Sequence, residues 1–366
     1  MGEANDRYTS FVIPFDEDRY GKPVALKNIA ADILSAPVSE IWFRHRPRLD
    51  FQSNNLFEAG NGSQRIILKE YLKPEEFDTS PVREFRALEL LSHLELAPQP
   101  RAFYPHSSDR RPVVVYDFMS GRMWDRRIPT EEELEMLAAI WIQTNEVRRD
   151  DLWLSRGQET LIIQIWLGIK RQFQKYFDWA ESHYEKAKTA VTLCKTLCAD
   201  RMEIVADLSK YEVPLCFCRA DPRFANVIAR PDGSLGMVDW EDSGLRDPAI
   251  ELADTMTHPN QEDLLSQPQW KSFLDPYLEY RRRSDRTIDE RFHLYLGLLP
   301  VWWLSILLGE GLRRTKTGEL GGWRIHNMEP NRKLRRYLER ALAWPSYNVG
   351  PDIDKLDDVR FFPDIE

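Results

Sequence analysis

The chain has 366 residues, 42% of them hydrophobic, with 12 Trp and 17 Phe, which is enough for two lobes with buried cores. The formal net charge is −9 and Lys and Arg form only short clusters, so a nucleic-acid-binding surface is not expected. Four cysteines in so long a chain do not form a disulfide framework, and they indicate a reducing compartment. We therefore expect a folded cytoplasmic protein that does not bind nucleic acid.

The sequence also lacks an obvious targeting or membrane signal. Residues 1–19 are mixed in charge without an apolar core, so we expect no signal peptide. The most apolar run, 297–309, contains thirteen residues and a proline. This run is too short to span a bilayer, so it predicts a buried helix and no membrane partner.

The first part of the chain predicts a small antiparallel sheet. A helix over 23–34 precedes three β-prone runs over 38–44, 54–59 and 65–72. The sequence Gly-Asn-Gly at 60–62 separates the second run from the third, which is a strong hairpin signal.

A helix is predicted directly after this sheet. Ser80 is expected as its N-cap, with Pro81 in the first turn and apolar residues at helical spacing as far as Pro98. The buried run 112–121 then ends in a polar turn, which is expected to connect the two lobes.

From Thr130 onward the pattern is helical. Thr130 and Glu133 predict a capping box, and further helices are expected over 159–180 and 184–208. Because no repeat or low-complexity linker interrupts them, we divide the chain into lobes 1–121 and 122–366 rather than independent domains.

Polar residues that suit phosphate chemistry lie between residues 218 and 254. An apolar run ends just before Asp221, Asn226 follows five positions later, and two short β-prone runs lead to Asp239. Side chains at the ends of hairpin-spaced strands can converge on one point. Such oxygen ligands suit Mg²⁺ and phosphoryl transfer, although isolated loop carboxylates and Asx turns would give the same residues.

The same residues resemble a known family. Asp221-x-x-x-x-Asn226, the run Val-Asp-Trp-Glu at 238–241, and the segment 244–254 resemble the signature block of the aminoglycoside phosphotransferase and choline kinase superfamily. This resemblance implies an α+β, two-lobed protein-kinase-like fold, with a small antiparallel sheet and one key helix before a larger helical lobe. It implies transfer of the γ-phosphoryl group of ATP to a hydroxyl group of a small molecule.

The resemblance assigns roles to residues in the second lobe. Asp221 would be the catalytic base, and Asn226 and Asp239 would bind Mg²⁺. Arg223 would stabilise charge near the γ-phosphate, while pairing with Asp242 or exposure to solvent remains the alternative.

The resemblance also implies a lysine–glutamate pair in the first lobe. Lys69, near the end of the third strand, would reach the α- and β-phosphates and be held by Glu84, fifteen residues downstream. Two ordinary exposed charges are the alternative interpretation.

Two further nucleotide contacts follow from the resemblance. Ser53 and Asn54 would meet the phosphates in a turn that lacks a glycine-rich pattern. The main-chain carbonyl of Asp117 and N–H of Met119 would bind the adenine.

The chain departs from the family pattern just before the predicted base. Arg219 and Ala220 stand where the family usually has His and Gly, so the loop needs a different brace, for which Asp239 and Asp247 are candidates. Asp247 is also expected to cap the next helix through backbone N–H groups.

Charge offers one clue to the acceptor. Six acidic residues and one basic residue lie between 239 and 254, which favours a cationic acceptor such as an amino sugar or a choline-like amine. Bound Mg²⁺ would offset part of that charge. Trp302 and Trp303 are candidate walls of an acceptor pocket, although each also suits the core.

Three alternative activities remain open on this fold. A pseudokinase would bind nucleotide without turnover, and a nucleotidyl transferase would transfer AMP. A protein kinase is disfavoured because no D-F-G or A-P-E sequence follows the predicted metal ligands. The acceptor, the choice between ATP and GTP, and the oligomeric state are not given by the sequence.

Overall fold

A computed structural model describes residues 24–46, 54–108, 110–124, 127–147, 158–317, 330–344, 356 and 358–363. The chain forms two compact units, which are Met1–Arg122 with Ile228–Ser243 (unit 1) and Met123–Val227 with Gly244–Glu366 (unit 2). The chain first passes from unit 1 to unit 2 after Arg122, next to the predicted boundary at 121. The segment Ile228–Ser243, however, packs in unit 1 and not with the larger helical part in which the sequence analysis placed it.

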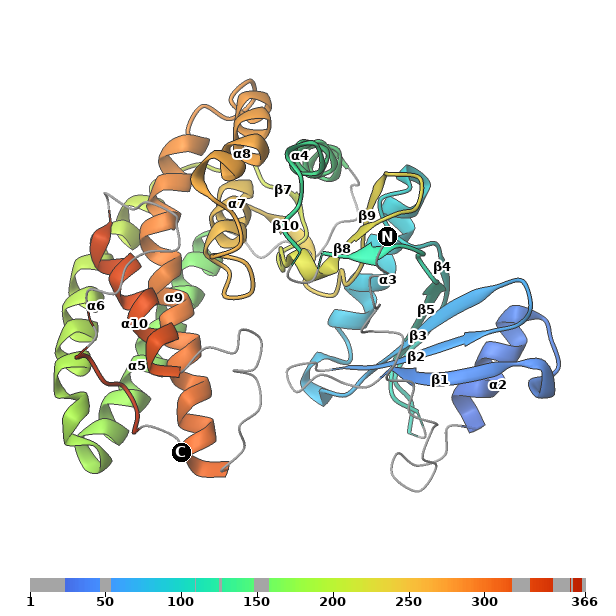
Figure 1. Ribbon diagram of the computed structural model, residues 1–366, viewed down its shortest axis with the longest axis horizontal. Helices are drawn as coiled ribbons and strands as arrows, with labels where there is room; N and C mark the ends of the chain where they lie inside the picture. Colours follow the sequence, from blue (N-terminus) through green and yellow to red (C-terminus); the bar gives the residue numbers. More distant parts are fainter. Residues whose placement is uncertain are drawn as a thin grey trace, which may run out of the picture. The chain divides into compact units, whose positions relative to one another are not determined.

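Unit 1 is built on a five-stranded antiparallel sheet with strand order β1-β2-β3-β5-β4 (Figure 1). Its strands are β1 (Trp42–Arg46), β2 (Asn54–Gly60), β3 (Arg65–Tyr71), β4 (Pro100–Tyr104) and β5 (Val113–Asp117). The first strand begins later than predicted because Val38–Glu40 is a 3-10 turn. All three of its side chains are exposed, so no buried face draws them into the sheet.

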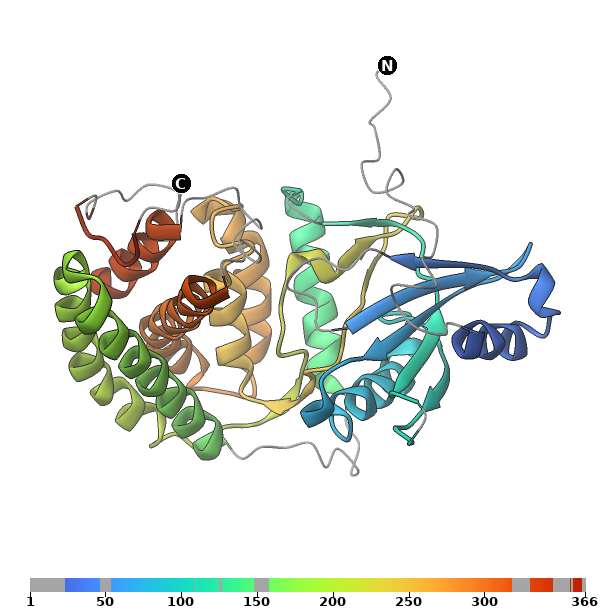
Figure 2. The same ribbon diagram turned by 90° about the horizontal axis from the view of Figure 1, so that it is seen from below.

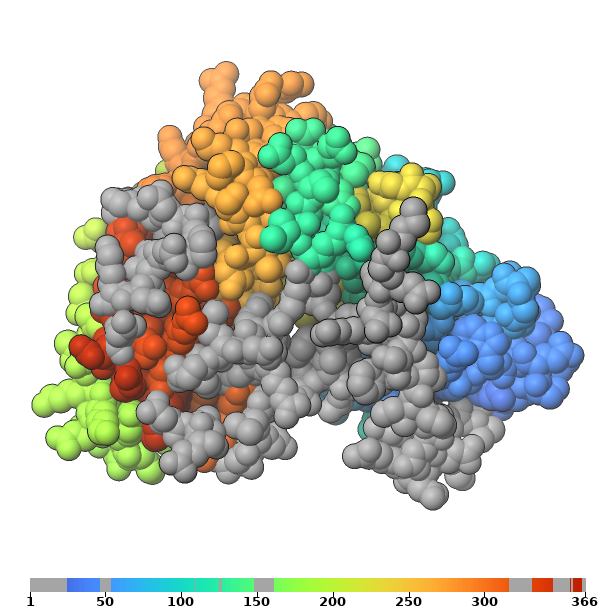
Figure 3. All heavy atoms as spheres, in the orientation of Figure 1, coloured from blue at the N-terminus to red at the C-terminus, as the bar shows by residue number. Residues whose placement is uncertain are grey.

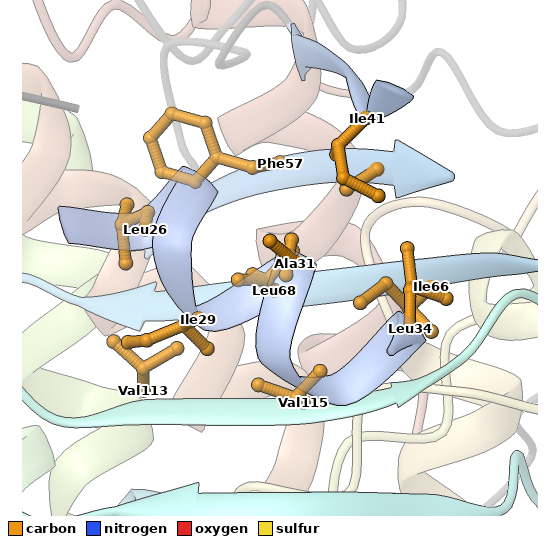
Figure 4. Packing of buried hydrophobic residues seen from close by; sticks show 12 residues of the cluster. Leu26, Ile29, Ala31, Leu34, Ile41, Phe57, Ile66, Leu68, Val113 and Val115 are labelled. Carbon is orange, nitrogen blue, oxygen red and sulfur yellow. The ribbon is translucent and has the colours of Figure 1, made fainter. Parts of the chain in front are cut away.

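The helix α2 (Val24–Leu34) covers one face of this sheet. Leu26, Ile29 and Leu34 recur at helical spacing, and Figure 4 shows them directed at side chains of β2, β3 and β5. Phe57 and Val115 are among the strand residues in this cluster. Burial of each large side chain contributes about 1.5–3 kcal/mol, so the apolar stripe of α2 fixes the helix on the sheet.

The helix α3 (Ser80–Leu91) packs against β4 and β5. Ser80 was predicted as its N-cap, but Thr79 holds that position and makes no side-chain capping bond. Ser80 is instead a buried residue of the first turn, next to Pro81. The helix ends well before Pro98, and a 3-10 turn (Ser92–Leu94) follows it.

Three short strands form a second sheet in the order β6-β8-β9. They are β6 (Arg122–Met123), β8 (Val227–Ala229) and β9 (Leu235–Met237). The chain changes unit within β6 and again within β8. Gly121 precedes β6 with φ +147°, and a Cβ there would lie 2.5 Å from the Ala229 carbonyl oxygen, so this position requires glycine.

Unit 2 is mainly helical, with α9 near its centre. Helices α5, α6, α7 and α10 pack against α9 (Figure 2), and α4 lies against α8, as their atoms show in Figure 3. The helices are α4 (Glu131–Glu146), α5 (Gln158–His183), α6 (Lys188–Leu208), α7 (Pro248–Thr257), α8 (Gln267–Arg281), α9 (Ile288–Thr317) and α10 (Pro330–Ala343). Strands β7 (Cys216–Cys218) and β10 (Gly244–Arg246) pair antiparallel.

Local signals located the start of α4 correctly and that of α6 less well. The predicted capping box is present at α4, where Thr130 Oγ1 accepts from the Glu133 N–H at 3.2 Å and the Glu133 carboxylate accepts from the Thr130 N–H at 2.9 Å. The helix expected over 184–208 begins at Lys188, after a 3-10 turn at Glu185–Ala187.

The apolar run 297–309 lies inside the much longer helix α9, so the length argument against a membrane span was wrong. By length and composition, Ile288–Thr315 could cross a membrane. Half of its most apolar window is buried inside the protein, which is also typical of a core helix. Leu298, Val301 and Leu304 are fully buried.

Candidate active site

In unit 1, Lys69 lies at the centre of a group of carboxylates. It is on β3, 3% exposed, and opposite Leu56 of β2 and Val114 of β5. Its Nζ lies 2.6 Å from Glu84 Oε2, 2.6 Å from Asp239 Oδ1 and 3.0 Å from Glu241 Oε2. The predicted Lys69–Glu84 pair therefore forms, and the interpretation of these residues as ordinary exposed charges was wrong.

These carboxylates keep Lys69 charged despite its burial. Burial alone would lower the pKa of Lys69, but the negative charges of Asp239, Glu241 and Glu84 outweigh it and raise the pKa well above its usual value. Burial also raises the pKa of Glu84, and it raises the pKa of Glu241 to about 7. The Tyr71 hydroxyl donates to Glu84 and so completes the buried cluster.

A strained turn holds Asp239 beside Lys69. Asp239 has φ +68°, a left-handed conformation that is uncommon outside glycine and is typical of functional turns. The next residue, Trp240, is fully buried, and its Nε1–H donates to the Met237 carbonyl at 3.1 Å. The Trp240 carbonyl in turn accepts from the Ser243 hydroxyl at 2.7 Å. The tryptophan therefore anchors the turn that presents the carboxylates on either side of it.

The predicted phosphate turn is described only in part. Ser53 lies outside the described residues. Asn54 is 7% exposed, and its Nδ2 donates to Glu241 Oε2 at 2.6 Å. Asn54 is thus joined through Glu241 to the Lys69 cluster, a contact that the sequence analysis did not foresee.

The predicted hinge residues lie at the end of β5. The Asp117 carboxylate pairs with Arg101, with bonds of 2.6 and 2.9 Å. Phe118 follows, and the Arg65 guanidinium lies over its ring at 3.7 Å. Met119 Sδ packs against Gly236, where an added Cβ would lie only 2.4 Å from the sulfur. These contacts fix the segment whose main chain was predicted to bind adenine.

In unit 2, Asp221 follows β7 and gathers three polar side chains. Its Oδ2 accepts from Arg223 Nε at 2.7 Å and Nη2 at 2.5 Å, and lies 3.4 Å from Asn226 Nδ2. Its other oxygen, Oδ1, lies 3.7 Å from His258 Nε2. The structure thus brings Asp221, Arg223 and Asn226 together as a local group, with Arg223 paired to the predicted base.

Two buried side chains that the sequence analysis missed support this loop. Glu251 Oε1, on α7, accepts from the N–H groups of Arg219 at 2.6 Å and Ala220 at 2.9 Å. Gln261 accepts from the Phe224 N–H at 2.7 Å and donates to the Pro222 carbonyl at 2.8 Å. They provide a brace beyond the candidates named from the sequence, and Ala220, with φ +68°, needs one.

Asp247 has the capping role predicted for it and a second one. Its Oδ1 accepts from the Ala249 N–H at 2.9 Å at the start of α7. Both of its oxygens also bind the fully buried Arg291 at 3.0 Å, and Arg291 in turn binds Asp285. Asp247 thus joins α7 to α9 and is structural.

Most acids of the segment 239–254 have a partner inside the protein. Asp239 and Glu241 face Lys69, Asp247 faces Arg291, and Glu251 faces backbone N–H groups. The remaining site acid on α7, Asp254, accepts from Trp303 Nε1 at 2.8 Å, and burial raises its pKa to about 7. The partners of Glu251 and Asp254 are uncharged N–H groups, and Lys69 is shared among three carboxylates, so the segment keeps a net negative charge and a cationic acceptor stays a prediction.

A model of the phosphotransferase enzyme family matches residues 46–291, two thirds of the chain. The chain belongs to the phosphotransferase enzyme family. No curated protein matches the sequence. The resemblance inferred from Asp221, Asn226 and Asp239 is therefore confirmed at the level of the family.

Solved structures show that this phosphotransferase-family chain has the kinase-like fold. The choline kinase LicA from Streptococcus pneumoniae matches at 18% identity with a TM-score of 0.58, covering 88% of this chain and 99% of that one. An ethanolamine kinase from Plasmodium vivax matches at 14% identity with a TM-score of 0.57, covering 92% of each chain. The AMP-bound spectinomycin phosphotransferase APH(9)-Ia matches at 14% identity with a TM-score of 0.58, covering 80% of this chain and 91% of that one.

Carboxylate oxygens are the ligands that Mg²⁺ prefers, and those of Glu84, Asp239 and Glu241 lie within 4.8 Å of one another in this phosphotransferase-family chain. The cation that these three carboxylates hold here is the Lys69 ammonium, so the binding of Mg²⁺ by Asp239 stays a prediction. Asn226 belongs to the other unit, so its action on the same ion as Asp239 stays a prediction.

Four polar residues near the predicted ones were missed: Glu241, Glu251, His258 and Gln261. Glu251 carried a usable signal, because a carboxylate in the apolar start of a helix, Pro-Ala-Ile-Glu-Leu-Ala, is expected to have a buried partner. His258 and Gln261 lie in the polar stretch 258–263, where a structural role was the simpler interpretation.

Proposed function

We propose that this protein transfers the γ-phosphoryl group of Mg²⁺-bound ATP to a hydroxyl group of a small molecule. The observation that carries the proposal is Lys69, buried on a strand of a phosphotransferase-family chain and bound at 2.6 Å to both Glu84 and Asp239. A lysine held in this way can present one fixed positive charge to nucleotide phosphates.

The nucleotide would be held mainly by residues of unit 1. Lys69, oriented by Glu84, would contact the α- and β-phosphates, and Ser53 and Asn54 would meet the phosphates from the turn before β2. The carbonyl of Asp117 and the N–H of Met119 would bind adenine. AMP is bound in structures of LicA and of the spectinomycin phosphotransferase, which have the same fold, and this supports a nucleotide as ligand.

Asp239 and Asn226 would hold the Mg²⁺, with Glu241 as a further oxygen donor next to Asp239. When bound, the ion would neutralise charge on the β- and γ-phosphate oxygens. Asp239 and Asn226 would not need to transfer a proton, so their role is to supply oxygen ligands at fixed positions.

Asp221 would orient the acceptor hydroxyl and accept its proton. Arg223, bound to Asp221 Oδ2, would place positive charge near the transferred group. The Glu251 and Gln261 contacts keep the loop in place while the proton moves.

We infer that amino alcohols are the first acceptors to test. The structural neighbours are a choline kinase, an ethanolamine kinase and a spectinomycin phosphotransferase, which supports a hydroxylated amine. Uncharged polyols are the comparison class for these amines, because the acids at 239–254 have partners inside the protein.

The reaction would take place in the cytoplasm. All four cysteines are free, and Cys194, Cys216 and Cys218 are buried, which is typical of a protein kept in a reducing compartment.

The test is a screen of hydroxylated amines and polyols with Mg²⁺-ATP, followed by mass spectrometry of the product. A gain of one phosphate supports the proposal, a gain of AMP indicates a nucleotidyl transferase, and nucleotide binding without any product indicates a pseudokinase. Asp221→Asn should lower kcat about 10²- to 10⁴-fold with ATP affinity retained. Asp275→Asn, at an exposed position of α8, is the matched control and should leave kcat unchanged. Normal turnover by Asp221→Asn would exclude its role as base.

A further inference from the structure

His258 lies next to the carboxylate oxygen of Asp221 that Arg223 and Asn226 leave open. It follows the last residue of α7 and is 5% exposed. Its Nε2 is 3.7 Å from Asp221 Oδ1, whereas the contacts of Arg223 and Asn226 are to Oδ2. The two oxygens of the predicted base therefore face different partners.

The hydrogen bonds of His258 indicate which ring nitrogen carries the proton. Nδ1 accepts from the Asn260 N–H at 3.2 Å, so Nδ1 has no proton of its own. A neutral imidazole then carries its proton on Nε2, the nitrogen that faces Asp221. The His258 carbonyl accepts from the N–H groups of Gln261 and Glu262 at 3.0 Å, which fixes the backbone beneath the ring.

The neighbours of the ring also fix its orientation. The Trp303 ring meets the His258 ring at 71° with centroids 4.6 Å apart. Trp303 is itself held by its bond to Asp254, which lies one turn before His258 on α7. Backbone, indole and Asn260 together leave the imidazole one orientation, with Nε2–H toward Asp221.

We propose that His258 is a positioning residue for Asp221, donating its Nε2–H to Oδ1 when an acceptor binds. A distance of 3.7 Å is too long for a hydrogen bond, but hydrogen bonds in active sites are often long without substrate and shorten when it binds. His258 on Oδ1 and Arg223 on Oδ2 would then fix the carboxylate plane, and the second lone pair of Oδ1 would remain for the hydroxyl proton. This inference rests on the proposed role of Asp221 as base.

Two substitutions separate positioning from a merely structural role. The side-chain oxygen of His258→Asn can replace Nδ1 as acceptor for the Asn260 N–H, but the amide is too short to reach Asp221. The amide of His258→Gln can reach the place of Nε2 and donate to Asp221, but it leaves the Asn260 N–H without that acceptor. Positioning predicts a larger loss of kcat for the Asn variant, about 10- to 100-fold with the KM for ATP unchanged, and partial rescue by Gln. If His258 has only a structural role, the Gln variant should lose more kcat than the Asn variant, because kcat would then follow the stability lost with the Asn260 hydrogen bond.

The assay uses the full chain with Mg²⁺-ATP and the acceptor from the screen, or ATP hydrolysis by water if no acceptor is found. Stability of each variant is measured in parallel by urea denaturation, and the exposed His93→Asn is the control that should change nothing. Equal kcat for wild type and His258→Asn, with Asp221→Asn inactive, would overturn positioning and leave the proposed function intact.

A measurement without turnover tests the geometry by itself. In NMR spectra of ¹⁵N-labelled histidine, His258, assigned from the spectrum of His258→Asn, should give the Nε2–H tautomer. Its signal should also shift in Asp221→Asn. An Nδ1–H tautomer, or a signal indifferent to Asp221→Asn, would overturn the inference. If wild type has this signature but shows no product and no hydrolysis, the proposed function fails, and with it the positioning role.

Discussion

The contact between Glu251 and the loop before Asp221 can be tested by two substitutions of different chemistry. Glu251 is 4% exposed, and one of its oxygens accepts both the Arg219 and the Ala220 N–H groups. Glu251→Gln keeps an oxygen acceptor and removes the charge, whereas Glu251→Ala removes the acceptor. The two variants therefore separate the hydrogen bonds from the charge.

The magnitudes follow from the number of donors. A buried N–H that loses its partner costs about 1–3 kcal/mol, so Glu251→Ala should lower the free energy of unfolding by about 2–6 kcal/mol. Glu251→Gln replaces two charge-assisted hydrogen bonds by weaker neutral ones. Burial raises the pKa of Glu251, however, which means that its charge is unfavourable there, and the neutral amide removes that penalty. We expect the Gln variant to lie within about 1 kcal/mol of wild type.

Urea denaturation gives the stability of each variant, and the coupled phosphoryl-transfer assay gives kcat. Because the unsupported loop carries Asp221, Glu251→Ala should also lower kcat at least about tenfold, while Glu251→Gln keeps most of it. Glu135→Ala, at an exposed position of α4, is the control and should change neither quantity. Equal stability of the Ala and Gln variants, or wild-type kcat in Glu251→Ala, would refute the reasoning.

Two further predictions concern the hinge and Asp254. Gly236→Ala should weaken ATP binding measured by titration calorimetry but lower stability by at most about 1 kcal/mol, because its Cβ would lie 2.4 Å from Met119 Sδ and would displace that flexible side chain at small cost. Gly62→Ala, whose Cβ would meet nothing within 4 Å, should change neither, and the same result for both variants would contradict the packing. Burial raises the pKa of Asp254 from 3.8 to about 7, so the folded state binds this proton more tightly than the unfolded state. The protonated carboxyl contributes fully to stability below pH 4, and this contribution is lost as the pH rises to 7. The free energy of unfolding measured in urea should therefore fall over this range in wild type and fall less in Asp254→Asn. Equal slopes for the two proteins would contradict a buried carboxyl at position 254.

Local sequence patterns predicted those elements of unit 1 whose determinants are close in the chain. The hairpin of β2 and β3 was found because two β-prone runs flank Gly-Asn-Gly, and the Asn61 side chain does close that turn by accepting the N–H groups of Ser63 and Gln64. The Lys69–Glu84 pair was found from the family resemblance, since the spacing of the two residues alone cannot show that they meet.

The larger errors concern long-range packing. The proline at position 300 lies inside α9 and does not end the helix, because α5, α7 and α10 pack against α9 and support it. Likewise the segment Ile228–Ser243 begins two residues after Asn226, yet it packs in unit 1, where Asp239 meets Lys69 of β3 across 170 residues. No local pattern contains either contact.

The loop before Asp221 was the hardest part to predict because its local preferences oppose its conformation. Ala220 and Asp239 both have φ +68°, which costs a side-chain-bearing residue about 1–2 kcal/mol, so neither conformation would be chosen from sequence. Such strain persists only where surrounding contacts fix the backbone, and at Ala220 the fixing group is Glu251, 31 residues away. Glu251 in turn has no evident role in its apolar helix until its partners are known. Ala220 and Glu251 are therefore one structural feature. It can be found from the sequence only by asking which distant backbone N–H groups a buried carboxylate binds.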